Sequence, residues 1–321
     1  MPAEPVTALI VAGPTASGKS ALALAIARHL DGTIINADSM QVYRELRVLT
    51  ARPTPQEEVL VPHLLYGVRA AAEPGNAAWW RSAALEAMEA ARQAGRLPIL
   101  CGGTGLYLTA LTEGLAAIPE PGPQARAEAR TLLAEMGPQA LHERLAAVDP
   151  DTAARLRPSD AQRIARAWEV WRGTERGLAA WQAEPLTRPA GWRFAAILLA
   201  PPRPELRAAI AARFAGMLAA GALAEVRALL ALQLDPALPA LRAQGVPELA
   251  AHLRGELSLA AAAERAVLAT GRYAKRQATW LRHHKLAPDD RTHTIHARIA
   301  CLGQFSERNI AEIFDFIRPA G

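Results

Sequence analysis

Three places in this sequence carry residues suited to phosphate binding or proton transfer: a lysine in a glycine-rich stretch, an aspartate after an apolar run, and a threonine after two glycines. The glycine-rich stretch, residues 13–20, fits the pattern G-x-x-x-x-G-K-[ST]. In this pattern backbone N–H groups converge on phosphate oxygens, the lysine reaches the terminal phosphate, and the last hydroxyl ligates Mg²⁺. We therefore predict a phosphate-binding loop of Gly13, Pro14, Thr15, Ala16, Ser17, Gly18, Lys19 and Ser20, with Ser20 on the metal.

The flanks of this stretch favour a phosphate-binding loop over a chance match. Residues 8–12 form a short apolar run with β-branched side chains, and residues 21–27 are strong helix formers. The chain has only three lysines, Lys19, Lys275 and Lys285, so a lysine at this point is not a default choice. An ordinary glycine-rich turn is the alternative.

The aspartate and the threonine each follow a run that predicts a strand. Asp38 comes directly after residues 33–37, and Thr104 follows residues 97–101 and two glycines. In a doubly wound parallel sheet the carboxyl ends of the strands form the ligand site, so we expect Asp38 close to the phosphate-binding loop. A turn or helix-cap role for Asp38 and an ordinary tight turn at Thr104 stay open as alternatives.

The elements that must position these residues indicate an α/β fold. Strand-like runs, including one at 64–68, alternate with helical stretches and resume at residues 192–200, which predicts a parallel sheet flanked by helices. Proline-rich clusters at 118–123 and 184–189 bound a stretch without any strand pattern. We predict a discontinuous core over 1–118 and 192–290, an all-helical insertion domain over 119–191, and a C-terminal tail over 291–321 with a docking helix that carries Ile310, Ile313, Phe314 and Ile317.

Two of the expected helices carry a basic face. In the insertion, Ser159 with Gln162 three residues later predicts a capping box, and Arg163 and Arg166 share a face opposite Ile164. Residues 257–285 form a basic amphipathic segment, in which Gly271 allows a bend. A solvated surface is the simpler interpretation of both faces, and a nucleic-acid contact is the alternative.

Composition narrows the class of protein. The net charge of +5 permits a polyanionic partner. The two cysteines, Cys101 and Cys301, predict neither a disulfide framework nor a Cys-rich zinc module. No apolar run reaches membrane-spanning length and the N-terminus does not resemble a signal peptide, so we expect a cytoplasmic protein with no membrane contact.

Four separated motifs, in this order, resemble those of the tRNA dimethylallyltransferase family, bacterial type. They are residues 13–20, 38–43, 102–107 and 273–280, and the resemblance covers nearly the whole chain. It implies a P-loop NTPase-like core and the transfer of a dimethylallyl group from dimethylallyl diphosphate to N6 of adenosine 37, in the anticodon loop of tRNA. Mg²⁺ is the implied cofactor and a monomer the implied form. The phosphate-binding loop would hold the leaving diphosphate.

The resemblance also assigns roles. Asp38 matches the general base, Thr104 a group at the reacting centre, and Arg213 a diphosphate clamp. The implied tRNA contacts are Asp38, Ser39, Met40, Gln41, Thr104, Arg126, Gln162, Arg163, Ile164, Ala165, Arg166, Arg242, Gly245, Arg272, Lys275, Arg276 and Gln277. The chain departs from the family pattern at Gly245-Val246-Pro247, at Glu175 and at Gly271.

Three other functions share part of this pattern. An adenylate isopentenyltransferase would use the same donor with a free nucleotide as acceptor. A small-molecule P-loop kinase would bind ATP in the loop and use Asp38 as a base on a hydroxyl. An RNA-binding protein with an ATP switch would need an aspartate after an apolar strand for Mg²⁺, and we find none that is convincing.

Overall fold

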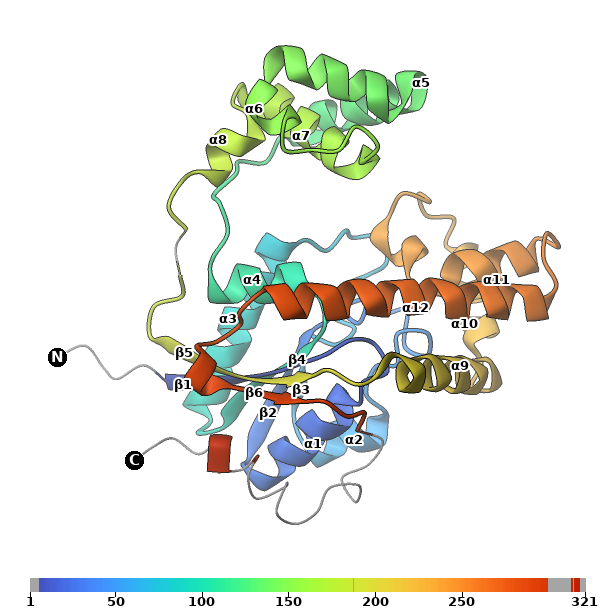
Figure 1. The fold of residues 1–321 in the computed structure, drawn as a ribbon. Helices are drawn as coiled ribbons and strands as arrows, with labels where there is room; N and C mark the ends of the chain where they lie inside the picture. The colour runs from blue at the N-terminus through green and yellow to red at the C-terminus, as the bar shows by residue number, and fades with distance from the viewer. Residues whose placement is uncertain (1–5, 187, 300–312, 314, 318–321) are drawn as a thin grey trace. The chain divides into compact units, whose positions relative to one another are not determined.

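A parallel sheet of six strands, in the order β3-β2-β4-β1-β5-β6, organises the larger of two compact units (Figure 1). The structure is a computed structural model that describes residues 6–186, 188–299, 313 and 315–317. The strands are β1 (Val6–Ala12), β2 (Gly32–Ala37), β3 (His63–Leu64), β4 (Leu97–Gly102), β5 (Trp192–Leu199) and β6 (Thr292–Ile295). This sheet confirms the predicted α/β class.

Helices cover both faces of the sheet in this unit, which comprises residues 1–112 and 189–321. Along β1 successive side chains alternate between two hydrophobic cores, so Ile10 packs with one core and Leu9 and Val11 with the other. The helices of this unit are α1 (Lys19–His29), α2 (Pro55–Leu60), α3 (Ala77–Gln93), α4 (Gly105–Thr112), α9 (Arg203–Ala219), α10 (Ala222–Ala231), α11 (Val246–Leu253) and α12 (Leu259–His283).

Three predicted features of this unit change in the structure. The strand expected at 64–68 is only the two-residue β3, because Leu65 adopts a left-handed φ of +64° that turns the chain. The tail expected over 291–321 begins with β6, which pairs with β5 and extends the sheet. Helix α12 runs through Gly271 as one element.

The predicted docking helix lies only partly within the described residues. Ile313 and Ile317 are helical and buried against the core that contains Leu9 and Val11, whereas Ile310, Phe314 and also Cys301 lie outside the described residues.

The smaller unit, residues 113–188, is helical throughout its described elements. Its own core joins Leu141, Leu145, Ile164 and Trp168. The first helix is interrupted at Gly137, which has a φ of +75° and precedes a proline, a residue that disfavours helical geometry in its predecessor. The helices are α5 (Gly122–Val148), α6 (Pro150–Ala153), α7 (Ala161–Thr174) and α8 (Leu178–Gln182).

The predicted capping box of α7 is wrong. The N-cap is Asp160, whose carboxylate accepts the Arg163 N–H, and not Ser159. An aspartate one residue nearer the helix places its oxygen within reach of the first free N–H groups, so it displaces the serine from the cap.

Candidate functional site

The phosphate-binding loop connects the end of β1 to the start of α1, which begins at Lys19. Gly18 caps the helix with a left-handed φ of +93°, and a Cβ atom there would collide with the Ile299 carbonyl oxygen. A residue with a side chain is therefore excluded at Gly18. The loop presents the N-terminus of α1, which carries a partial positive charge and free N–H groups suited to phosphate.

The back of this loop is held by the C-terminal part of the chain. The Ile299 N–H donates to the Ser17 carbonyl oxygen at 2.9 Å, and Arg298 Nε donates to the Ala16 carbonyl oxygen at 3.1 Å. A loop that turns its N–H groups toward a ligand leaves its carbonyl groups in need of other donors, and these two residues supply them. No local pattern in the sequence marks Arg298 or Ile299 for this role.

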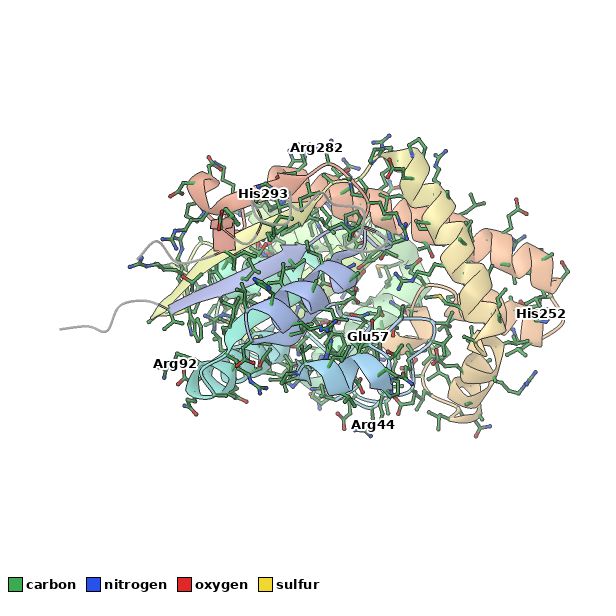
Figure 2. All side chains as sticks on the ribbon, turned by 90° about the horizontal axis from the view of Figure 1, so that it is seen from below. Arg44, Glu57, Arg92, His252, Arg282 and His293 are labelled. Atoms are coloured by element: carbon green, nitrogen blue, oxygen red, sulfur yellow. The ribbon has the colours of Figure 1, made fainter. Side chains whose placement is uncertain are left out.

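Lys19 is buried at the base of the site, unlike most cations of this unit. Arg44, Arg92 and Arg282 lie at its periphery with exposed side chains (Figure 2). Lys19 Nζ is 3.5 Å from the Pro14 carbonyl oxygen. Burial lowers the pKa of Lys19, and the negative charge of Asp38 partly opposes that shift. An ammonium held away from water beside the loop interacts strongly with a phosphate oxygen.

Asp38 lies at the end of β2, where the sequence predicts it, and it is half-buried. Its Oδ1 accepts the Met40 N–H at 2.9 Å, so Asp38 does make the turn contact of the simpler interpretation. The same carboxylate also lines one cavity with Lys19 and Arg213. Within the part of the chain that the structure describes, Oδ2 has no hydrogen bond. One oxygen thus fixes the side chain, while the other is free of such a bond and can accept a proton.

Thr104 ties the ends of β2 and β4 together. Its N–H donates to the Ala37 carbonyl oxygen at 3.3 Å, and its Oγ1 accepts the Ser39 N–H at 2.9 Å. Burial and then the charge of Asp38 raise the pKa of Tyr273, on α12, to about 12, and the nearby Thr104 hydroxyl opposes this shift. Thr104 is therefore a junction beside the carboxylate. Tyr273, the first residue of the motif at 273–280, also lines the cavity.

An apolar part of the cavity wall comes largely from α9. Arg213 is half-buried among these side chains, where burial lowers its pKa and the charge of Asp38 raises it. The apolar lining consists of Met40, Leu49, Ile210, Phe214 and Met217. Ile210, Phe214 and Met217 have helical spacing, so the sequence indicates that they share one face of a helix but does not indicate what this face packs against. The cavity combines two cations and one carboxylate with an apolar surface.

The loop that carries Leu49 and Thr50 into the cavity is held by a carboxylate from α10. Glu225 accepts three successive backbone N–H groups, those of Arg47 and Val48 at 2.7 Å each and that of Leu49 at 3.0 Å. The Thr50 carbonyl oxygen then receives Gln41 Nε2 at 2.9 Å and Arg213 Nη2 at 3.4 Å.

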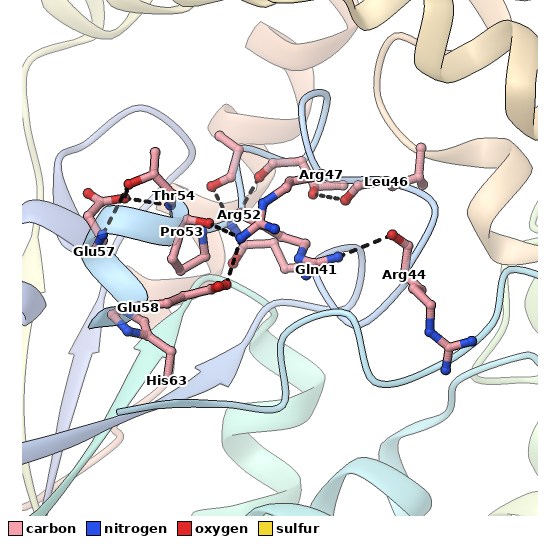
Figure 3. A network of polar contacts seen from close by, with 12 residues as sticks. Gln41, Arg44, Leu46, Arg47, Arg52, Pro53, Thr54, Glu57, Glu58 and His63 are labelled. Carbon is pink, nitrogen blue, oxygen red and sulfur yellow. Dashed lines mark hydrogen bonds and ion pairs between the residues drawn. The ribbon is translucent and has the colours of Figure 1, made fainter. Parts of the chain in front are cut away.

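On its outer side the same loop is held by a polar network (Figure 3). Arg47 donates to the Pro53 carbonyl oxygen at 2.7 Å and to Glu58 at 2.8 Å, and Arg52 donates to the Arg44 carbonyl oxygen at 3.2 Å. Sequence reasoning missed both Glu225 and this network, because their partners are distant in the sequence or are backbone atoms.

In the smaller unit, the predicted RNA residues separate into exposed and buried ones. Gln162 and Arg163 are exposed, Arg166 pairs with Glu169 at 3.2 Å, and Ala165 is half-buried. Arg126 is exposed and forms an ion pair with Glu120.

The prediction for Ile164 is corrected by its position. Its side chain is fully buried in the core of this unit, because it lies on the inner face of α7, so it cannot contact a ligand directly.

In the larger unit, Arg242, Arg272 and Arg276 line one surface depression, and Lys275 is exposed nearby on α12. The prediction for two other residues is corrected. Gly245 is buried at the N-cap of α11, where a Cβ would lie 3.0 Å from Leu49 Cδ2.

Gln277 is also buried, and its amide bonds protein backbone. Neither Gly245 nor the Gln277 side chain is exposed for contact with RNA, because both residues face the interior of the unit.

Ser20, the predicted Mg²⁺ ligand, lines the same cavity as Lys19 and Asp38. Among the described residues, no cluster of three or more His, Cys, Asp or Glu side chains can hold a metal by itself. Mg²⁺ usually combines a few protein oxygens with substrate phosphate oxygens and water. A Ser20 hydroxyl beside a phosphate-binding loop fits that set of donors.

The described helices differ in length and apolar character from a membrane-spanning segment. None is long and apolar enough alone, although α9 and α10 together meet the criteria of length and composition with a bend of 66° between them.

Family models match most of this chain. The model described as IPP transferase matches residues 41–284, and the model described as isopentenyl transferase matches residues 6–64. A tRNA dimethylallyltransferase of Granulibacter bethesdensis is 64% identical over 97% of this chain and 98% of its own length. One from Gluconacetobacter diazotrophicus is 62% identical over 96% of this chain and 93% of its own length.

Solved structures resemble the chain in fold as well. The tRNA isopentenylpyrophosphate transferase of Bacillus halodurans is 29% identical, with a TM-score of 0.68 over 98% of this chain and 96% of that one. A eukaryotic dimethylallyltransferase, described as acting on tRNA, is 25% identical with a TM-score of 0.78 over 97% of this chain and 79% of that one. Both the phosphate-binding loop and the helical unit fall within the matched length.

Proposed function

This chain belongs to the tRNA dimethylallyltransferase family and is a prenyltransferase; we propose that it transfers a dimethylallyl group from dimethylallyl diphosphate to N6 of adenosine 37 in the anticodon loop of tRNA. Diphosphate is the other product. The observation that carries the proposal is the single cavity lined by Lys19, Asp38 and Arg213 together with apolar side chains. The two cations suit an anionic leaving group, the carboxylate suits an amine that loses a proton, and the apolar side chains suit a five-carbon chain.

The cations act on the leaving group. As the bond between the allylic carbon and the diphosphate oxygen breaks, negative charge grows on diphosphate and positive charge spreads over the allylic carbons. Lys19, Arg213 and the N–H groups at the start of α1 stabilise the first of these charges in a site largely shielded from water. Ser20 would hold Mg²⁺ together with diphosphate oxygens, and the metal would supply additional positive charge to the leaving group.

Asp38 acts on the nucleophile. The exocyclic amine of adenine is a weak nucleophile, and the new C–N bond leaves it with a proton to lose. Asp38 accepts that proton through Oδ2, while Oδ1 stays fixed by the Met40 N–H. The apolar side chains of Leu49, Phe214 and Met217 exclude water from the allylic carbon, which would otherwise be hydrolysed.

Both units contribute cations for RNA. In the smaller unit we assign the contact to Gln162, Arg163 and Arg166, and in the larger unit to the depression lined by Arg242, Arg272 and Arg276, with Lys275. Guanidinium groups on these surfaces can neutralise backbone phosphates. The target adenine must leave its stack to reach Asp38, and an unpaired loop permits that at low cost.

The test is an acceptor comparison with labelled dimethylallyl diphosphate. We expect label in tRNA, mapped to adenosine 37 by nuclease digestion, and none in AMP. Label in AMP alone would indicate an adenylate isopentenyltransferase, and consumption of ATP with phosphate transfer would indicate a kinase. Chelation of Mg²⁺ should slow the transfer. Our proposal includes a cytoplasmic monomer, and light scattering of the purified protein checks the monomer.

A further inference from the structure

One amide side chain in the C-terminal third of α12 bridges two loops that form the site. Gln277 is 5% exposed. Its Oε1 accepts the Thr15 N–H at 2.8 Å, and its Nε2 donates to the Gly103 carbonyl oxygen at 3.0 Å. Thr15 and Gly103 lie 262 and 174 positions away in the sequence. A donor on one side and an acceptor on the other fix the orientation of the amide, so only an amide of this length satisfies both.

The surroundings are shaped around this amide. A Cβ atom on Gly103 would collide with Gln277 Nε2 and would lie 2.7 Å from the Gly13 carbonyl oxygen. The glycine thus lets the Gly103 backbone approach both the amide and the phosphate-binding loop. Three segments that are far apart in the chain meet at this point without space for any larger group.

Each end of the bridge leads to a reacting group. Thr15 belongs to the phosphate-binding loop and lines the cavity. Gly103 precedes Thr104, which holds the N–H of Ser39, the residue after Asp38. We propose that Gln277 is a positioning residue that sets the separation between the bound diphosphate and the general base. This inference rests on the proposed function.

The requirement for such a bridge is geometric. Displacement needs the amine, the allylic carbon and the leaving oxygen close to one line, and a displacement of 1 Å can cost on the order of 10²-fold in rate. Neighbouring side chains of α12, Lys275 and Arg276, point outward and are exposed. The helix therefore offers cations on its outer face while Gln277 holds the site from its inner face.

The experiment replaces Gln277 with methionine, which has a similar length and no amide. With saturating tRNA and donor, we expect the single-turnover rate of Gln277→Met to fall by roughly 10- to 100-fold. The dissociation constant for tRNA should stay within about two-fold of wild type, because Gln277 does not face the ligand side. Gln93→Met, on the exposed surface of α3, is the matched control and should behave as wild type.

Three results would overturn the inference. The first is a single-turnover rate at saturating substrates that does not change. The second is a weaker affinity for tRNA with a normal saturating rate. The third is a lower melting temperature with a normal rate at temperatures where the variant is folded. Should Gln277→Met not fold, Gln277→Glu serves instead, because it keeps the acceptor for Thr15 and loses the donor to Gly103. It should show the same loss of rate. A wild-type protein that transfers no label to tRNA would refute the proposed function itself, independently of Gln277.

Discussion

Asp38→Asn separates the proposed general base from a turn residue. The substitution keeps Oδ1, which accepts the Met40 N–H at 2.9 Å, and replaces Oδ2 by an amide nitrogen of similar size. Asparagine is as suited to this turn as aspartate. The remaining hydrogen bond loses its charge, which is worth about 1 kcal/mol, so the protein should stay folded. The variant cannot accept a proton from the amine, and the rate should fall by about 10²- to 10⁴-fold. That loss corresponds to roughly 3 to 5 kcal/mol in the activation free energy.

The cations around Asp38 lead to a second expected effect of this substitution, on the affinity for diphosphate. Burial lowers the pKa of both Lys19 and Arg213, and the negative charge of the Asp38 carboxylate partly opposes both shifts, so this carboxylate offsets part of their positive charge. Without this negative charge the two cations attract an anion more strongly, so diphosphate affinity should hold or increase while the rate falls. Single-turnover rates at saturating substrates, diphosphate titrations and melting curves measure the three quantities. A folded Asp38→Asn variant with a rate near wild type would refute the general-base assignment and leave Asp38 as a turn residue.

Three other perturbations test the rest of the site. Lys19→Ala should weaken donor binding and slow transfer at least 10²-fold, whereas Lys285→Ala, at an exposed lysine paired with Asp289, should not, as donor titrations will show. Because burial lowers the pKa of Lys19, its ammonium loses its proton at a lower pH than an ordinary lysine does, and the donor affinity of the wild-type protein should fall in the same pH range. A donor affinity that stays constant up to the pKa of a free lysine would contradict this. Glu225→Ala removes the acceptor of three N–H groups and should destabilise the protein by about 2 to 4 kcal/mol in urea unfolding, with a higher KM for the donor; a loss below about 0.5 kcal/mol would show that water replaces the carboxylate. Arg163 and Arg166, if replaced together by alanine, should reduce the slope of tRNA affinity against salt concentration by about 2, and an unchanged slope would exclude both from the RNA contact.

Local patterns in the sequence determined the features that depend on neighbouring residues. The phosphate-binding loop could be predicted because its glycines, its lysine and the helix that follows act within about eight positions. The strand before Asp38 followed from an apolar run, and the side of α7 opposite Arg163 and Arg166 followed from helical periodicity. The alternation of strands and helices was sufficient to predict the α/β class, since a parallel sheet requires such crossovers.

Only the tertiary structure decided which faces of the helices meet. Periodicity shows that a residue lies on a helix face but does not say what covers that face. The family resemblance placed Ile164 and Gln277 on RNA, although both side chains are buried. Asp38, Lys19 and Arg213 come from β2, α1 and α9, and no spacing in the chain records their convergence on one cavity. Glu225 likewise bonds backbone N–H groups more than 170 positions away, and such groups are the same at every position of a sequence. These contacts depend on how whole elements pack, and that packing is selected by the burial of both faces of the sheet together rather than by any single segment.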